Sequence, residues 1–501
     1  MLARAKPEYA IPEVCRNFVN GQWVNSSVRL PVINPVDEQV LTEIAEADAG
    51  LVDDAVGSAR RTFEKGTWSK LGLEERQKVL FRIADLIDEH ADELAWLESM
   101  NIGSPLSQCR GRHVPRAAYN FRFFAEYISQ SRSDAYTQLD NYLSVVTREP
   151  VGVAALIGPW NAPIALTSMK IAAALAFGNC CVVKPSEISP LTALRMVDLI
   201  RESGVPDGVV NLVNGSGAVT GAALASHPDI DVLSFTGGTA TGRAIMSAAG
   251  QNLTPVTLEL GGKSANIIFD DADFERALDG ALISIFSNNG QQCLAGSRIL
   301  VQEGIAERFI DAFVQRTRNL RIGDPLLPET EVGPLATKQH LDRVHSFVDT
   351  LEADGCKLLI GGNPCAGFEK GFYYEPTAVL APDNKAVVCQ EEIFGPFAAF
   401  QIFKTPQQAW DIANDSKFGL LGYVWTSNYA TAMAAHEHVK SGVLCINSPI
   451  IRELRAPFGG YKESGVGRES GAACEAFYSE LKTTAFLTGD VPLRKLGAGE
   501  A

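Results

Sequence analysis

The chain has 501 residues, more than one ordinary domain holds, so we expect two large lobes or one lobe with excursions. Its hydrophobic fraction of 46% and charged fraction of 21% are typical of a globular protein with a large core. A formal net charge of −15, without any run of Lys and Arg, argues against a nucleic-acid partner, which would need a basic patch.

The N-terminal segment MLARAKPEYAIPEV has neither the apolar core nor the small-residue cleavage site of a signal peptide, which favours a cytoplasmic protein. The ten cysteines agree with that location, because they are sparse and form no CxxC pair. Reduced thiols are therefore favoured over a disulfide framework or a zinc cluster.

Residues 73–100 are the first segment with a clear period. Apolar side chains recur there at the spacing of one helix face, which predicts an amphipathic helix; they are Val79, Ile83, Leu86, Ile87, Leu94 and Leu97.

Residues 151–169 carry no charge and nearly reach the length of a membrane-spanning helix. They are interrupted by Gly158, Pro159, Asn161 and Pro163, and proline removes a backbone donor in a place where lipid offers no replacement. A buried strand, a tight turn and a buried helix are favoured over a membrane span, so no membrane partner is expected.

From residue 151 onward, short apolar runs alternate with helical segments. The predicted strands are 151–157, 180–183, 209–213 and 231–235, and the predicted helices include 164–177 and 190–203. A second series follows, with strands at 256–260, 265–269 and 297–301 and a helix near 273–288. This alternation is typical of doubly wound α/β folds, and we expect the chain to change lobes around Gly261–Gly262.

Cys293 lies in NNGQQCLAGSR, between a predicted helix end and a strand. Most cysteines in such a protein are small buried hydrophobes, and that interpretation stays open here. The neighbouring residues 288–292, however, form a polar and flexible segment in which a thiol can meet a substrate. Because a deprotonated thiol is the best nucleophile available near neutral pH, Cys293 is a candidate nucleophile.

Glu259, in TLELGGKS, ends a predicted buried strand, where it could simply form a salt bridge. The glycines after it let the backbone approach closely, and a carboxylate at the carboxyl end of a strand faces the ligand crevice of an α/β sheet. A desolvated carboxylate there can accept a proton from water or a thiol, so Glu259 is a candidate general base.

Two more segments carry signals for ligands. PWNAP (159–163) holds the amide of Asn161 among prolines, where it either caps a turn or donates to an oxygen that becomes negative. SFTGGTATGR (234–243) combines a strand, a glycine turn and a helix start, which gives a phosphate a place at a helix N-terminus. Its GxxxxG spacing alone is weak evidence for a dinucleotide.

Seven segments follow one another along the chain: PWNAP, VVKPSE, FTGGTATG, LELGGKS, NNGQQCLAGSR, EEIFGP and APFGGYKESGVGRE. In order and spacing they resemble the aldehyde dehydrogenase superfamily over about residues 15–487. The resemblance implies a Rossmann-type NAD-binding domain (1–127 and 150–260), an α/β catalytic domain (261–460) and a small β element for oligomerisation (128–149 and 475–490).

Motif for motif, the resemblance implies a nucleophilic Cys293, with the amide of Asn161 and the backbone N–H of Cys293 stabilising a thiohemiacetal oxyanion. Hydride transfer would leave a thioester, which water activated by Glu259 would hydrolyse. Lys184 and Glu187 would hold the adenosine ribose and Glu391 the nicotinamide ribose. The remaining implied cofactor residues are Trp160, Gly237, Gly238, Gly242 and Phe394.

Glu187 bears on the choice of cofactor. A carboxylate accepts a hydrogen bond from the 2′-hydroxyl and repels a 2′-phosphate, which favours NAD, although Lys184 beside it leaves NADP open. Gly238 stands where many relatives have Ser, so one hydroxyl contact is lost while backbone amides remain for the pyrophosphate. Ala162 and Met169 stand where many relatives carry aromatics, so we expect a wider substrate tunnel.

The segments INSPIIRELRAPFGGYKESGVGRE and VPRAAYNFRFFAEY resemble most the branch that handles semialdehydes from aromatic-ring degradation, such as 5-carboxymethyl-2-hydroxymuconate semialdehyde. In that branch Arg116 and Arg452 would clamp a substrate carboxylate, which a guanidinium matches with two parallel bonds, and Phe458 would line the substrate site. An internal salt bridge is an open alternative for either arginine.

Three alternative functions compete with the oxidation of a semialdehyde. A general aliphatic or aromatic aldehyde dehydrogenase is one alternative, and a CoA-acylating enzyme is another, although such relatives typically lack the glutamate found at position 259. A protein that kept the fold without the activity is disfavoured by the joint presence of Cys293, Glu259 and Asn161. No metal site is expected, because His436 and His438 point to different helix faces and His340 and His345 have no third ligand.

Residues 142–150 and 477–487 are predicted strands that either pair across a subunit boundary or form ordinary edges. Since relatives assemble as dimers or tetramers, the resemblance implies a homodimer or homotetramer, with a small aldehyde as the other partner.

Overall fold

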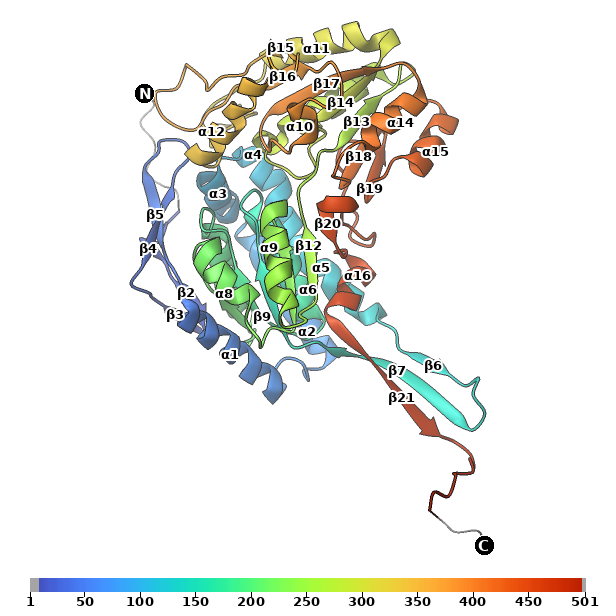
Figure 1. Ribbon diagram of the computed structural model, residues 1–501. Helices are drawn as coiled ribbons and strands as arrows, with labels where there is room; N and C mark the ends of the chain where they lie inside the picture. Colours follow the sequence, from blue (N-terminus) through green and yellow to red (C-terminus); the bar gives the residue numbers. More distant parts are fainter. Residues whose placement is uncertain (1–8, 498–501) are drawn as a thin grey trace.

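Residues 9–497 are described by the computed structural model, in which two α/β lobes meet and two small three-stranded sheets are attached to them (Figure 1). No helix in this range is long and apolar enough to cross a membrane. The uncharged stretch 151–169 instead forms strand β8 (Val153–Ile157), a turn and the start of helix α6 (Pro163–Ala176), as its interrupted pattern predicts.

The first lobe is built on an eight-stranded sheet. Besides β8, its strands are Asn17–Val19 (β2), Gln22–Val24 (β3), Cys180–Lys184 (β9), Val210–Leu212 (β10), Val232–Thr236 (β11), Val256–Glu259 (β12) and Gly465–Val466 (β20). Their order is β20-β12-β11-β8-β9-β10-β2-β3, with the strands from β12 to β10 parallel. The chain fills one side of β8 and then the other, so the order reverses between β8 and β11, the point where such sheets bind ligands.

Helices cover this sheet, and one predicted boundary is wrong. They are Ala49–Lys65 (α1), Leu73–Glu89 (α2), Ala91–Ile102 (α3), Leu106–Gln108 (α4), Val114–Tyr127 (α5), α6, Leu191–Glu202 (α7), Ala222–Ala225 (α8) and Thr239–Gly250 (α9). The single helix predicted at 73–100 is two helices, because His90 leaves the helical conformation and binds Glu93 (2.9 Å) and Arg195 (3.1 Å). The apolar period continues across the break since α2 and α3 pack on the same core.

The second lobe has a seven-stranded sheet in the order β15-β16-β17-β14-β13-β18-β19. Its strands are Ala265–Ile268 (β13), Arg298–Gln302 (β14), Lys357–Ile360 (β15), Thr377–Leu380 (β16), Phe397–Phe403 (β17), Leu421–Trp425 (β18) and Val443–Ile446 (β19). Its helices are Phe274–Phe286 (α10), Ala306–Arg318 (α11), Lys338–Ser346 (α12), Val387–Gln390 (α13), Pro406–Asn414 (α14) and Tyr429–His438 (α15).

Grouping 256–260 with the second series is wrong. Strand β12 pairs in parallel with β11, with Glu259 opposite Thr236, and so completes the first sheet. The runs 256–260 and 265–269 look alike as patterns, and only the pairing partner decides which sheet each joins. The chain changes sheets between β12 and β13, at Gly261–Gly262, as expected.

Two small sheets complete the fold. One joins Val14–Cys15 (β1), Arg29–Ile33 (β4) and Val40–Ala45 (β5); the other joins Asp134–Tyr136 (β6), Tyr142–Pro150 (β7) and Ser479–Leu487 (β21) and projects away from the lobes (Figure 1). Strand β7 agrees with its predicted bounds. Strand β21 begins at Ser479 rather than at 477, because Phe477 still ends helix α16 (Gly471–Phe477).

Candidate active site

A cavity of about 720 Å³ lies between the carboxyl edge of the first sheet and the second lobe. It is lined by the three groups with predicted chemistry, the thiol of Cys293, the carboxyl of Glu259 and the amide of Asn161. Most predicted cofactor residues line it as well: Trp160, Lys184, Glu187, Gly237, Gly238, Glu391 and Phe394. The fold thus brings these segments, far apart in sequence, to one place.

The loop that carries Cys293 contains a left-handed turn. Asn288 (φ 54°), Asn289 (φ 58°) and Gly290 (φ 73°) lie in succession in the left-handed region. That conformation costs about 1–2 kcal/mol per ordinary residue, and Asn and Gly tolerate it best. A Cβ on Gly290 would also lie 2.2 Å from the Gly395 backbone, so only glycine fits. The sequence NNG therefore encodes the path that brings Cys293 to the cavity.

Buried hydrogen bonds hold this turn, so the predicted flexibility of the segment is wrong. Asn289 donates to the carbonyls of Gly103 and Pro334, both at 2.9 Å, and accepts from the N–H of Gly333 at 2.7 Å. Further bonds run from Asn288 Nδ2 to the Asn161 carbonyl, from Ala336 N–H to Gln291 Oε1 and from Gln292 Nε2 to the Ser284 carbonyl. The polar residues around Cys293 serve to shape its loop.

The half-buried thiol of Cys293 is protonated in this state. Burial raises its pKa to about 12; the carboxyls of Glu392 and Glu259 add to the rise, and Arg452 opposes it. Since the thiolate is the nucleophilic form, a base has to remove the proton before the sulfur can attack.

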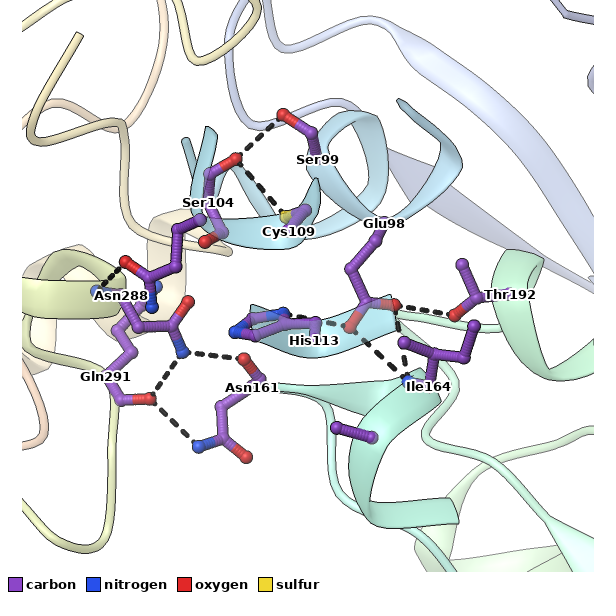
Figure 2. A network of polar contacts seen from close by, with 12 residues as sticks. Glu98, Ser99, Ser104, Cys109, His113, Asn161, Ile164, Thr192, Asn288 and Gln291 are labelled. Atoms are coloured by element: carbon purple, nitrogen blue, oxygen red, sulfur yellow. Dashed lines mark hydrogen bonds and ion pairs between the residues drawn. The ribbon is translucent and has the colours of Figure 1, made fainter. Parts of the chain in front are cut away.

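Asn161 is fixed against the Cys293 loop (Figure 2). Its Nδ2 donates to the Gln291 carbonyl at 2.9 Å, and its backbone carbonyl accepts from Asn288 Nδ2 at 2.7 Å. An amide nitrogen carries two N–H groups, so the second is left to donate into the cavity. Behind this loop, the buried carboxylate of Glu98 accepts from the N–H of Ile164 (3.3 Å) and so caps helix α6.

Glu259 is 4% exposed, and neither of its carboxyl oxygens has a hydrogen-bond partner among residues 9–497. Burial raises its pKa well above the ordinary value; the nearby Glu469 adds to this, whereas Lys170 and two arginines oppose it. A carboxyl with a raised pKa and no fixed partner is suited to taking up and releasing a proton.

A buried ion pair lies close to Glu259 and is not apparent from the sequence. Lys170 Nζ donates to Glu469 at 2.6 Å and to the Ser234 hydroxyl at 2.8 Å. Burial acts to raise the pKa of Glu469, but the charge and hydrogen bond of Lys170 outweigh it and lower that pKa. The two glutamates therefore differ, with Glu469 held ionised and Glu259 favoured in its neutral form.

Two glycines after Glu259 allow close contacts, as the sequence predicts. A Cβ on Gly261 would lie 2.1 Å from Glu392 Oε2, and one on Gly262 would lie 2.6 Å from the carbonyl oxygen of Cys293. A side chain at Gly262 would meet backbone, and one at Gly261 would displace the carboxyl of Glu392. The link between the lobes can therefore pass directly beside the nucleophile loop.

The start of helix α9 offers free N–H groups to the cavity. Gly238 is its N-cap and makes no side-chain cap bond; nothing lies within 4 Å of where its Cβ would be. Thr239 Oγ1 also lacks a partner in the described chain. This arrangement suits a phosphate. Gly242 lies outside the cavity lining, because it packs on Leu260, whose Cδ2 would be 2.5 Å from an added Cβ.

Lys184 and Glu187 stand together at the same end of the cavity. Lys184 Nζ is 3.7 Å from Glu187 Oε2 and donates to the Pro185 carbonyl at 3.1 Å. Burial lowers the pKa of Lys184, against the pull of Glu187.

The EEIFGP segment presents two adjacent glutamates in different ways. Glu391 is partly exposed and pairs with Lys417 at 2.6 Å. Glu392 accepts the N–H of Gly262 at 2.8 Å, and burial raises its pKa to about 7. Both line the cavity, where the ring of Phe394 packs edge-to-face on Trp160 at 5.3 Å. The sequence points only to Glu391, because a pair of glutamates does not reveal which one turns inward.

Arg116 on helix α5 and Arg452 lie close to each other without a carboxylate partner. Within residues 9–497 neither forms an ion pair, so the alternative of an internal salt bridge is excluded there. Arg452 donates to the Ser470 hydroxyl at 2.8 Å and stacks 3.7 Å above the ring of Phe458. Burial and then the charge of Arg452 lower the pKa of Arg116 to about 9.

A third guanidinium, that of Arg112, joins this group. It too forms no ion pair in the described chain, and the charges of Tyr423 and Cys293 act on it, which puts it near the nucleophile. Its spacing of four from Arg116 along a helical segment is the signal that would have found it.

Three histidines from the sequence analysis lie on helices α12 and α15. Across residues 9–497 no group of three or more His, Cys, Asp or Glu side chains could hold a metal ion. His436 is exposed on α15. His340 bonds the carbonyl of Phe394 at 2.7 Å, and His345 lies 3.4 Å from the hydroxyl of Tyr374.

Known proteins match the chain over nearly all of its length. Residues 23–484 match the model of the aldehyde dehydrogenase family. The 5-carboxymethyl-2-hydroxymuconate semialdehyde dehydrogenase of Escherichia coli is 41% identical, over 91% of this chain and 97% of that protein. The structure of betaine aldehyde dehydrogenase from Staphylococcus aureus in complex with NAD+ has a TM-score of 0.94 at 37% identity and covers 97% of each chain. That of HpcC from Thermus thermophilus has a TM-score of 0.93 at 41% identity, over 96% of this chain and 95% of that one.

Proposed function

The chain belongs to the aldehyde dehydrogenase family, and we propose that it oxidises a carboxylated semialdehyde to the corresponding acid through a thioester on Cys293. As a member of this family it is an NAD(P)-dependent oxidoreductase that acts on aldehydes. The observation that carries the proposal is the convergence of the Cys293 thiol, the Glu259 carboxyl and the Asn161 amide on one cavity between the lobes.

The residues around the cavity fit a dinucleotide. The uncapped start of α9 and the open space at Gly238 suit a pyrophosphate, and the carboxylate of Glu187 suits a ribose 2′-hydroxyl, which favours NAD over NADP. For the second ribose we favour Glu392 over Glu391, because Glu391 is already paired with Lys417. When bound, NAD supplies the acceptor for the hydride that leaves the substrate carbon.

Acylation begins with the transfer of the thiol proton from Cys293 to Glu259, once that carboxyl, which is neutral at rest, has released its own proton to solvent. The thiolate then attacks the aldehyde carbon to give a thiohemiacetal. The free N–H of the Asn161 amide and the backbone N–H of Cys293 donate to the new oxyanion, and such donors contribute most when they are fixed in advance. The bonds of Asn161 to the Cys293 loop provide that fixation. Loss of hydride from the substrate carbon re-forms the carbonyl as a thioester.

Deacylation uses the same groups. Glu259 passes the proton from the thiol to solvent and then takes a proton from water. The resulting hydroxide attacks the thioester carbonyl. The same donors hold the oxyanion until the sulfur leaves as a thiolate, which is then reprotonated. Because both carboxyl oxygens of Glu259 lack partners within residues 9–497, they are free to bind that water.

The guanidinium groups support an anionic substrate. The charge of Cys293 acts on Arg112 and Arg452, and Arg116 lies beside both arginines. None of the three has a carboxylate partner in the described chain, and burial lowers the pKa of Arg116 and Arg452. Like charges gathered in this way call for an anion between them. A semialdehyde with a distal carboxylate provides one, and the relative from Escherichia coli is named for such a substrate.

The test is the Arg452→Ala variant, assayed by NADH formation with a carboxylated semialdehyde and with a neutral aldehyde of similar size. Loss of a charge-assisted pair costs about 1.5–3 kcal/mol, so KM for the carboxylated substrate should rise roughly 10- to 100-fold. KM for the neutral aldehyde should change little. Equal effects on both would refute the carboxylate site.

Controls come from the same chain. Arg110, which is paired with Asp92 at 2.7 Å, is a matched arginine whose replacement by Ala should leave both KM values unchanged. Cys293→Ala should abolish NADH formation with every aldehyde. Added CoA should give no acyl-CoA product; if it does, the thioester is transferred rather than hydrolysed.

We also propose that the sheet of β6, β7 and β21 joins copies of the chain into a homodimer or homotetramer. Its exposed apolar side chains support this: Tyr136, Leu481, Phe486 and Leu487. Light scattering of the intact protein should give a mass above that of one chain. A chain that ends before β21 should give the mass of a monomer.

A further inference from the structure

Helix α12 holds three successive carbonyls of the EEIFGP segment. His340 Nε2 lies 2.7 Å from the carbonyl oxygen of Phe394. One turn later, Arg343 donates to the carbonyls of Glu392 (2.7 Å) and Ile393 (3.2 Å). A helix that binds consecutive carbonyls in this way fixes the path of the backbone, since each bond restrains one peptide group.

The backbone held there is strained. Phe394 has φ 64°, in the left-handed region, which costs a bulky residue about 1–2 kcal/mol. The next residue, Gly395, packs so closely on α12 that an added Cβ would lie 2.8 Å from Val344. Such a conformation persists only where the surrounding structure holds it, and the bonds from α12 are among those that do so.

The strained segment directs two side chains into the cavity. The carboxyl of Glu392 accepts from the N–H of Gly262, and the ring of Phe394 meets Trp160. The imidazole of His340 closes an aromatic cluster, with its ring centre 5.2 Å from that of Trp160 and 6.0 Å from that of Phe394. Four of these residues line the cavity together with Cys293: Trp160, His340, Glu392 and Phe394.

The protonation of His340 agrees with this role. A carbonyl oxygen only accepts, so Nε2 has to carry the hydrogen. Desolvation lowers the pKa of His340 to about 4, and the charge of Arg343 acts in the same direction against the bond to Phe394. The ring is therefore a neutral donor throughout the neutral range.

We infer that His340 and Arg343 form a backbone clamp that keeps Glu392 and Phe394 in the conformation that binds the dinucleotide. His340 is thus a positioning residue for the cofactor, and its carbonyl bond, rather than a metal or a proton transfer, is its function. This inference rests on the proposed function only in taking a dinucleotide as the ligand.

The test compares His340→Ala, His340→Gln and Arg343→Ala with the wild type in the cofactor-free protein. Hydrogen exchange of the backbone around residues 391–396, followed by mass spectrometry, should speed up in the two Ala variants. Calorimetric titration with NAD+ should give a Kd about fivefold higher for each lost hydrogen bond. His340→Gln keeps a side-chain N–H donor and should restore both values toward the wild type.

His345→Ala is the matched control, because His345 lies on the same helix and its recorded contact is with Tyr374 rather than with the strained segment. It should leave both exchange and Kd unchanged. Alkylation of Cys293 without NAD+ should also proceed at the wild-type rate in His345→Ala.

Unchanged exchange and Kd in His340→Ala, or equal changes in His345→Ala, would overturn the clamp while the wild type still binds NAD+. Failure of the wild type itself to bind NAD+ would overturn the proposed function together with the clamp.

Discussion

The polar groups near the nucleophile fall into two halves that use hydrogen bonds in opposite ways. Around Asn161 and the turn 288–292, buried amides are bonded to one another and to neighbouring backbone. Around Glu259 and the three arginines near the nucleophile, the carboxyl has no hydrogen-bond partner and the guanidinium groups have no carboxylate partner in the described chain.

This difference separates stability from chemistry. The bonded half fixes the positions of the nucleophile and the oxyanion donors, and its bonds stabilise the fold. The unpaired half keeps a carboxyl available for water and guanidinium groups available for substrate, and a buried polar group without a partner costs stability. Substitutions in the first half should therefore weaken the fold, whereas those in the second should weaken activity alone.

Glu259→Gln should have the largest effect among the tests of this comparison. Loss of a general base lowers kcat by about 10²- to 10⁴-fold, and the thioester should accumulate because deacylation needs activated water. Mass spectrometry of the protein after mixing with aldehyde and NAD+ should detect the acyl group on Cys293. The same variant should melt at or above the wild-type Tm; a lower Tm would contradict the idea that Glu259 is unpaired.

Asn161→Ala should come next, because Asn161 belongs to both halves. Loss of one oxyanion donor lowers kcat by about 10²- to 10³-fold. The variant should also lower Tm, since the Gln291 carbonyl loses one of its two donors and keeps only Asn288 Nδ2. Kinetics and calorimetry on one preparation measure the two effects. A loss of activity with no change in Tm would mean that the amide serves the reaction only.

Asn289→Ala tests the bonded half alone. It removes two donors and one acceptor from buried backbone groups and puts alanine at φ 58°. The free energy of unfolding should fall by about 2–4 kcal/mol, from unsatisfied buried groups and backbone strain. Denaturant titration measures this loss. An unchanged midpoint would show that the turn does not depend on its bonds.

The smallest effect is a pH dependence of the Tm difference between Glu259→Gln and the wild type. The pKa of Glu259 is raised in the folded state, so this group favours folding in acid and ceases to do so as pH rises through its folded pKa. Glutamine does not titrate. As pH increases from acid to neutral, the Tm of the variant should therefore rise relative to that of the wild type. A Tm difference that stays constant with pH would argue against the raised pKa.

Much of the fold follows from periodicity. The parallel series from β8 onward, the change of lobes at Gly261–Gly262 and the strand 142–150 are all confirmed, because apolar runs of strand length and glycine turns are local signals. The break at His90 and the sheet joined by β12 are not local, since they depend on Arg195 and on β11. The predicted family resemblance is confirmed as well.

The candidate site shows the same division between local sequence signals and contacts made by distant residues. Cys293, Glu259 and Asn161 stand in recognisable motifs, and the fold brings all three to the cavity. Their assigned roles remain predictions. Glu392 and the pair Lys170–Glu469 carry no sequence signal that distinguishes inward from outward side chains, so only their contacts single them out. Arg112 could have been found from its spacing to Arg116. The flexible segment predicted at 288–292 is wrong because polar composition does not reveal whether the partners are water or backbone.

The left-handed turn also bears on how the protein ages. Asn289 precedes Gly290, and an exposed Asn-Gly pair is the sequence most prone to spontaneous deamidation, because glycine offers little hindrance to the attack of its backbone nitrogen on the amide carbon. In the native loop the Asn289 amide is buried and bonded on both sides, which holds it away from that reaction. A chain that opens loses the shelter, and an aspartate formed there would place a carboxylate against the carbonyls of Gly103 and Pro334. Each unfolding event therefore exposes Asn289 to slow deamidation, and a chain damaged in this way would refold without the two bonds that its amide donates.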